Sequence, residues 1–167
     1  FQNDTTATLE DDSGIDSINA AAVRFDAYID LYDGVIAANT VTYGIADWSI
    51  IENAFSGKGA DRLVGNDADN LLNAGAGNDV LEGGLGDDTL IGGTGSDTAV
   101  YAGNQDEYTV VWDATTETIT VTDKKSSDSD EGTDTLTGIE RIVFADGDIS
   151  LSEQVGSNAP VANRTLL

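Results

Sequence analysis

Residues 56–100 read SGKGADRLV, GNDADNLLN, AGAGNDVLE, GGLGDDTLI and GGTGSDTAV, which are five consecutive units of nine residues in one register. The sixth position of each unit carries an acidic or amide side chain, namely Asp61, Asn70, Asp79, Asp88 and Asp97. The eighth position carries an apolar side chain, namely Leu63, Leu72, Leu81, Leu90 and Ala99. A spacing kept through five units indicates one small structural element that is repeated along the chain.

Each unit divides into a glycine-rich loop of six residues and a triplet that can form a short strand. In an extended triplet the middle side chain points to one face and its neighbours point to the other. The leucines are therefore expected to face inward, and the outward positions are Arg62, Val64, Glu82 and Ile91. Glycine tolerates a positive φ, which lets the chain turn sharply after each triplet. We expect two units to make one coil, so that equivalent loops recur every 18 residues.

Such a coil stacks loops that carry acidic side chains at two edges. One edge would bring together Asp61, Asp79 and Asp97, and the other would place Asp88 beside Asn70. Neighbouring strands lie about 4.8 Å apart and Ca²⁺ takes oxygen ligands at about 2.3–2.6 Å, so an ion fits between two stacked loops. The sequence thus predicts several Ca²⁺ ions, held by carboxylates and main-chain carbonyl oxygens. The glycines expected to supply these carbonyls are Gly57, Gly59, Gly75, Gly77, Gly84, Gly86, Gly93 and Gly95.

The nonapeptide resembles the RTX, or hemolysin-type, repeat, which is the repeat known for binding Ca²⁺. The resemblance implies an all-β fold containing a parallel β-roll, in a secreted bacterial protein that a type I secretion machinery exports and that folds on meeting extracellular calcium. The departures from the repeat are Ser56 and Ala74 for the first glycine, Ala68 for a later glycine, Asn70 for the aspartate and Ala99 for the large apolar residue. We expect the edge with Asn70 to be the weaker one.

The residues before the repeats predict a short β cap. Residues 1–12 are interpreted as a linker or the cut end of a longer chain, and residues 13–55 as an N-terminal β cap that begins with a degenerate half-turn, Ser13–Asn19. Strands are expected at Tyr28–Leu31, Thr40–Tyr43 and Trp48–Ile51. Through Ile51–Ala54 and the repeats, the segment also resembles the C-terminal domain of serralysin-type metalloproteases. The zinc-binding helix of that family needs histidine, and this chain has none.

The residues after the repeats predict a second cap. Residues 101–106 keep the nine-residue register, which places Asp106 nine residues beyond Asp97 and makes it a candidate ligand beside Asp88; the β-roll is therefore assigned to residues 56–106. A hairpin is expected from Tyr108–Trp112 and Thr118–Thr122, within a C-terminal β cap at residues 107–152. In that cap Gly132–Thr137 resembles another partial repeat, and Gly138–Phe144 is expected to form a strand. Residues 153–167 are interpreted as a linker to a following module.

Composition restricts the classes of partner and of chemistry. The chain has 31 acidic and 7 basic residues, a formal net charge of −24, which repels nucleic acid and anionic membrane. It has no cysteine for disulfides or thiol chemistry and no apolar run long enough to span a membrane. A secreted, extracellular or cell-surface location is expected, with calcium in the place of disulfides as the stabilising element.

Three functions follow from these observations. The favoured one is a non-catalytic calcium-binding module of a larger secreted protein, in which it supports export, stability or spacing; in that case Asp79→Ala should do most harm, because loops flank it on both sides. An enzyme would have to use a carboxylate pair, since histidine and cysteine are absent. The alternative is a module that binds polysaccharide or a partner protein through an aromatic platform of Trp48, Tyr101, Tyr108 and Trp112.

Overall fold

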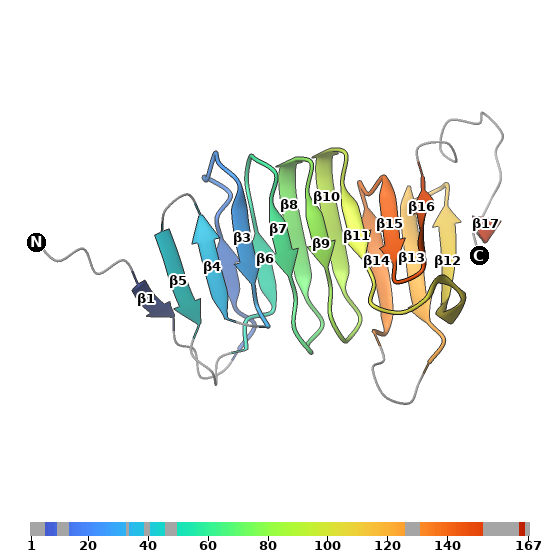
Figure 1. The fold of residues 1–167 in the computed structure, drawn as a ribbon, viewed down its shortest axis with the longest axis horizontal. Coiled ribbons are helices and arrows are strands. Elements are labelled where there is room, and N and C mark those ends of the chain that lie inside the picture. Colours follow the sequence, from blue (N-terminus) through green and yellow to red (C-terminus); the bar gives the residue numbers. More distant parts are fainter. Residues whose placement is uncertain are drawn as a thin grey trace, which may run out of the picture.

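The computed structural model describes residues 6–9, 14–32, 34–38, 41–45, 50–125, 131–151 and 164–165. Within these residues the regular elements are β-strands and one 3-10 turn, η1 (Gln105–Glu107), without an α-helix. None of the described residues forms a helix long and apolar enough to cross a membrane. The strands run side by side in two sheets along an elongated body (Figure 1). The expected all-β fold is confirmed.

Both sheets are mixed. The first has the order β1 (Thr6–Leu9), β5 (Val41–Ile45), β4 (Val35–Ala38), β3 (Ala27–Asp30), β7 (Arg62–Val64), β9 (Val80–Glu82), β11 (Thr98–Val100), β15 (Arg141–Phe144) and β16 (Gly147–Ser150). The second has the order β17 (Arg164–Thr165), β12 (Tyr108–Asp113), β13 (Thr118–Asp123), β14 (Thr133–Thr137), β10 (Thr89–Gly95), β8 (Leu71–Gly77), β6 (Asn53–Phe55) and β2 (Ser17–Asn19). The repeat strands pair in parallel, and antiparallel pairs such as β3 with β4 and β12 with β13 lie toward the ends.

The repeat units alternate between the two sheets, as the two-unit coil requires. Leu63 pairs with Leu81 in the first sheet, and Leu72 pairs with Leu90 in the second. Each pair of residues is separated by 18 positions, so the predicted spacing of equivalent loops is confirmed. We call one loop with the strand that follows it a rung, so that two rungs complete one coil.

The stack of rungs continues beyond the repeats in both directions. In the first sheet β3 precedes the repeats and β15 follows them, with Ile29 paired to Leu63 and Ala99 paired to Ile142. In the second sheet β2 and β6 precede β8, and β14 follows β10 in parallel register. Each sheet therefore holds five stacked rungs, and the segments expected to form separate caps supply rungs of the same stack.

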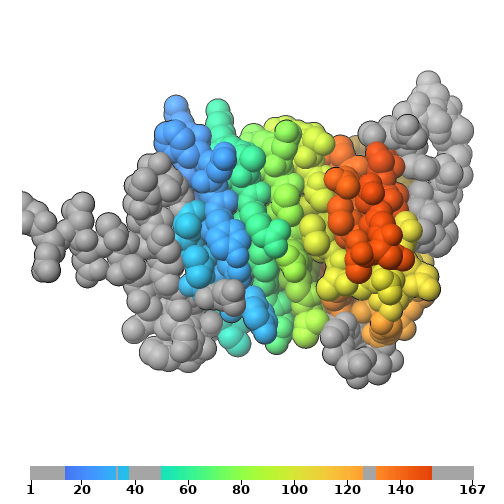
Figure 2. Space-filling model, viewed as in Figure 1, coloured from blue at the N-terminus to red at the C-terminus, as the bar shows by residue number. Residues whose placement is uncertain are grey.

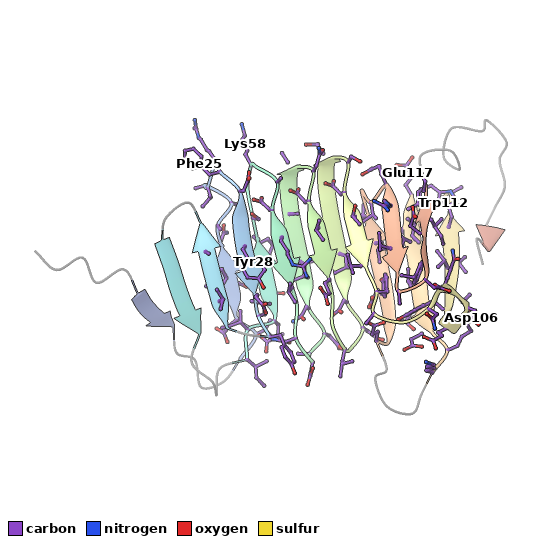
Figure 3. All side chains as sticks on the ribbon, viewed as in Figure 1. Phe25, Tyr28, Lys58, Asp106, Trp112 and Glu117 are labelled. Carbon is purple, nitrogen blue, oxygen red and sulfur yellow. The ribbon has the colours of Figure 1, made fainter. Side chains whose placement is uncertain are left out.

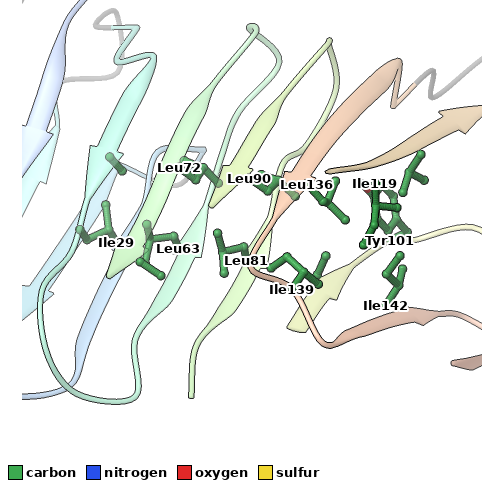
Figure 4. Packing of buried hydrophobic residues seen from close by; sticks show 14 of the residues in the cluster. Ile29, Leu63, Leu72, Leu81, Leu90, Tyr101, Ile119, Leu136, Ile139 and Ile142 are labelled. Carbon is green, nitrogen blue, oxygen red and sulfur yellow. The ribbon is translucent and has the colours of Figure 1, made fainter. Parts of the chain in front are cut away.

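The core lies between the sheets as two rows of apolar side chains (Figure 4). One row consists of Ile29, Leu63, Leu81, Ala99 and Ile142, and the other of Ile18, Ala54, Leu72, Leu90 and Leu136. Leu63, Leu72, Leu81 and Leu90 are all 0% exposed, which confirms their inward orientation. The rows run through the continuous body that the space-filling view shows from blue to orange (Figure 2).

The predicted hairpin is confirmed, because β12 and β13 pair antiparallel. Two other expectations differ from the structure. Residues 6–9 form β1 and residues 164–165 form β17, although both segments were interpreted as linkers. Of the strand expected at Trp48–Ile51, residues 48–49 lie outside the described residues, and residues 50–51 are outside any strand.

Candidate calcium-binding site

The sixth-position side chains stack at the two edges of the coil, where each loop ends and its strand begins. Their register follows from the strand pairing, and it defines two columns. The first acidic column contains Ala27, Asp61, Asp79, Asp97 and Glu140. The second acidic column contains Asp16, Glu52, Asn70, Asp88 and Asp134. The repeat period therefore concentrates acidic side chains in two lines.

One hydrogen bond recurs along both columns and joins successive rungs. The main-chain N–H of Asp61 donates to Oδ1 of Asp79 over 2.8 Å, and the N–H of Asp79 donates to Oδ1 of Asp97 over 2.9 Å. In the second column the N–H of Asn70 donates to Oδ1 of Asp88 over 2.8 Å. Each of these aspartates thus uses one carboxylate oxygen to hold the preceding rung.

The second oxygen of three aspartates has no hydrogen-bond donor. It is Oδ2 of Asp79, Asp88 and Asp97, and in each case the atom is buried. The whole residues are 1%, 2% and 0% exposed, respectively. A buried carboxylate oxygen without a donor destabilises the fold. A cation bound at each of these oxygens would therefore stabilise it.

Burial also shifts the protonation of the same groups. Loss of hydration raises the pKa of Asp79 to about 6 and that of Asp88 to about 7. The hydrogen bond from the main-chain N–H of the preceding rung lowers each pKa but does not cancel this effect. Burial raises the pKa of Asp97 as well. Neighbouring acids add to the shift, among them Asp61 and Asp97 around Asp79. The metal-free fold therefore disfavours the charge on these carboxylates, which a bound cation would compensate.

The loops approach each other so closely that glycine is required. A β-carbon added at Gly77 would lie 1.5 Å from the carbonyl oxygen of Gly59, and one at Gly95 would lie 1.5 Å from that of Gly77. Gly95 also has a φ of +144°. Carbonyl oxygens of Gly57, Gly75 and Gly86 likewise lie against the glycines of the next loop. Main-chain oxygens therefore lie between the stacked loops, and the added β-carbon at Gly77 would also lie 2.8 Å from Oδ1 of Asp79, so the loops offer the oxygen ligands that Ca²⁺ prefers.

These donors fit Ca²⁺ better than a transition metal. In the described part of the chain, no three His, Cys, Asp or Glu side chains gather closely enough to hold an ion together. A single carboxylate oxygen must therefore act with main-chain carbonyls, and such an all-oxygen set suits a hard cation. The residues present fit calcium at Asp79, Asp88 and Asp97.

Two of the predicted ligands, Asp61 and Asn70, differ from these because protein groups already bind their side chains. Asp61 accepts hydrogen bonds at both carboxylate oxygens, from Ala27 N–H over 2.7 Å and Ser56 Oγ over 2.5 Å. Asn70 accepts from Asn66 N–H over 2.7 Å and donates to the carbonyl oxygen of Glu52 over 3.1 Å.

The placement of Asp106 beside Asp88 is wrong. Asp106 lies in η1, just before the start of β12, and it is exposed and points away from the repeats (Figure 3). Its expected place is taken by Asp134, whose Oδ1 accepts the N–H of Asp88 over 2.9 Å. In the first column Glu140 accepts the N–H of Asp97 over 2.7 Å. A sequence signal for both exists, because Asp134 and Glu140 each precede an apolar residue by two positions.

The proposed aromatic platform is not formed by the tyrosines. Tyr101 and Tyr108 are 5% and 2% exposed and pack in the core against Phe144. Trp112 is half-buried against the same core, and Trp48 lies outside the described residues. Tyr101, Tyr108 and Trp112 therefore stabilise the core near the C-terminal end of the stack.

Residues 55–90 and 64–99 match the RTX calcium-binding nonapeptide repeat, a family description that spans four copies. The chain therefore carries RTX repeats and contains a calcium-binding module, as the resemblance in the sequence predicted. The match covers residues 55–99 and leaves the rest of the chain unmatched. A comparison with curated proteins yields no match.

Proposed function

We propose that this chain is a calcium-dependent folding module of a larger secreted protein, in which Ca²⁺ ions complete a parallel β-roll. The observation that carries the proposal is the set of three buried, donor-free oxygens on Asp79, Asp88 and Asp97. One ion at each, held with glycine-loop carbonyls, would neutralise a charge that burial otherwise disfavours. Three ions are the number that this geometry supports best.

Calcium would then control folding, because the unfolded chain has no preformed site and binding energy adds to folding energy. The net charge of −24 opposes compaction until cations bind. A chain that stays unfolded at low calcium and folds at extracellular calcium suits export in an unfolded form. We therefore favour export by a type I machinery and a role in export, stability or spacing of the parent protein.

The module is proposed to act without catalysis of its own, since it has no histidine or cysteine and its buried carboxylates lie in stacked loops. The likeness of its N-terminal part to the serralysin C-terminal domain supports the same role as an accessory domain. Binding of polysaccharide is the weaker proposal, because burial removes Tyr101 and Tyr108 from the surface.

A calcium titration followed by far-ultraviolet circular dichroism tests the main proposal. Protein in chelator should show little strand signal and should gain it cooperatively with millimolar calcium. Mg²⁺ at the same concentration is the control, because it prefers a smaller octahedral site and keeps its waters. Identical spectra in chelator and in calcium would contradict calcium-dependent folding.

A further inference from the structure

In two aspartates of the acidic columns, the Oδ2 atom accepts a hydrogen bond from a protein hydroxyl. In Asp79, Asp88 and Asp97 the same atom has no donor. Oδ2 of Asp61 accepts from Ser56 Oγ over 2.5 Å, and Oδ2 of Asp134 accepts from Tyr101 Oη over 2.7 Å. Their Oδ1 atoms hold the preceding rung in the usual way, through Ala27 N–H and Asp88 N–H. Asp61 is the first aspartate of the first column and Asp134 is the last of the second, so each hydroxyl stands at one end of one column.

The first position of each unit explains the bond at Asp61. This position faces the sixth-position carboxylate of its own loop, because a β-carbon added at Gly83 would lie 2.0 Å from Oδ2 of Asp88. Ser56 occupies the first position of its unit and so places its hydroxyl on Asp61. Glycine or alanine at the first position offers no side-chain donor, which leaves the carboxylate oxygen open.

The bond at Asp134 comes from outside its loop. Tyr101 follows the last repeat strand directly, and its ring packs at 5.2 Å from Tyr108 and 5.7 Å from Phe144 between centroids. The residue is 5% exposed. The aromatic packing therefore holds the Tyr101 hydroxyl on Asp134 in an interior from which water is largely excluded.

We propose that Ser56 and Tyr101 act as hydroxyl plugs, which occupy the carboxylate oxygens of Asp61 and Asp134 and so exclude calcium from one end of each column. The inference rests on the proposed calcium-dependent function and sets which aspartates bind an ion. Calcium then holds the rungs of Asp79, Asp88 and Asp97, and protein hydrogen bonds hold those of Asp61 and Asp134.

Counting bound ions tests the plugs. Equilibrium dialysis with metal quantification, supported by native mass spectrometry, should give three Ca²⁺ per chain for the wild type. Ser56→Ala removes one plug with a residue that unit 74–82 already carries at the first position, and Tyr101→Phe removes the other while keeping the ring. Each variant should bind four ions, and the double variant should bind five.

Matched variants control for loss of a hydroxyl elsewhere. Ser96→Ala changes an exposed loop serine, and Tyr108→Phe removes a neighbouring hydroxyl that donates to Glu131 rather than to either column. Both should keep three ions. Ser56→Thr, which retains a hydroxyl, should also keep three.

The outcomes separate the plugs from the calcium function. A wild type that binds three ions, with Ser56→Ala and Tyr101→Phe also binding three, refutes the plugs and leaves the function intact. A wild type that binds five ions also refutes the plugs and leaves the calcium function intact. A wild type that binds none refutes the function itself. A plug variant that fails to fold at any calcium concentration also counts against the plugs, because an ion should replace the lost hydrogen bond.

Discussion

Replacing Asp79 by asparagine should stabilise the protein in chelator and destabilise it in calcium. The amide oxygen can still accept the N–H of Asp61, which Oδ1 of Asp79 does over 2.8 Å. Asn70 shows that an amide at the sixth position finds a carbonyl acceptor in the preceding rung. The substitution removes a negative charge. In chelator this charge destabilises the fold, whereas in calcium it helps to bind the ion.

The size of both effects follows from the structure. The pKa of Asp79 rises from 3.8 to about 6, and at 1.36 kcal/mol per unit this shift corresponds to about 3 kcal/mol at pH 7. Solvent around the loops screens the charge, so we expect a gain of about 1–2 kcal/mol in chelator. Losing one ion at a calcium concentration 100-fold above Kd removes about 2.7 kcal/mol. The net change in calcium is therefore a loss of about 1 kcal/mol.

The assay compares the two conditions directly. Folding in chelator is measured by circular dichroism across a series of sucrose concentrations, because this osmolyte favours the compact state. Stability in calcium is measured by urea unfolding. The control is Asp61→Asn, whose carboxylate is held by Ser56 and Ala27 rather than left open, so its effect should differ less between the two conditions than that of Asp79→Asn. Equal changes for Asp79→Asn in chelator and in calcium would refute the reasoning.

Three further outcomes are expected. In chelator, stability should fall between pH 5 and pH 8, because the pKa values of Asp88 and Asp134 are raised to about 7 and the folded state keeps protons that the unfolded state releases; a rise in sucrose-assisted folding over this range would contradict it. Gly77→Ala should cost about 3 kcal/mol in calcium by urea unfolding, since its β-carbon would lie 1.5 Å from Gly59 O. Leu81→Ala should cost about 2–5 kcal/mol in the same assay, because Leu81 is fully buried in its row.

Two substitutions serve as controls for the last pair. Gly147→Ala should leave stability nearly unchanged, because the nearest atom to its added β-carbon is 3.8 Å away. Leu85→Ala removes a partly exposed loop leucine and should lower the free energy of unfolding by less than about 1 kcal/mol. If Leu85→Ala costs as much as Leu81→Ala, the inner row does not dominate the apolar stabilisation.

The repeat region could be predicted well from sequence because its constraints are local and strictly periodic. A nine-residue unit with two units per coil places the sixth and eighth positions of every second unit on the same line, so Leu63 and Leu81 had to share a row and Asp79 had to lie between Asp61 and Asp97. The glycines at close contacts, such as Gly77, follow from the same period. Neither inference needs contacts from outside the repeats.

The flanking rungs could not be placed from sequence because long insertions interrupt the period. Asp134 stacks on Asp88 although 46 residues separate them, and a hairpin, β12 and β13, occupies much of the interval. The register kept by residues 101–106 favoured Asp106, but Tyr101 turns into the core there and ends the repeat. Ser56 is similar: its departure from glycine is visible in the sequence, whereas its bond to Asp61 is visible only in the structure.

The calcium requirement arises from the repulsion between stacked acidic side chains in each column more than from any one aspartate. Folding stacks acidic side chains at strand spacing, about 4.8 Å, and within the first column Asp61 and Asp97 both disfavour the charge on Asp79. Removing one charge relieves its neighbours, while adding one ion stabilises the rungs on both sides. Ions in the interior therefore couple adjacent coils. Asp61 and Asp134 each have a non-acidic neighbour on one side, Ala27 and Val121, so a hydroxyl from Ser56 or Tyr101 is enough to hold the carboxylate.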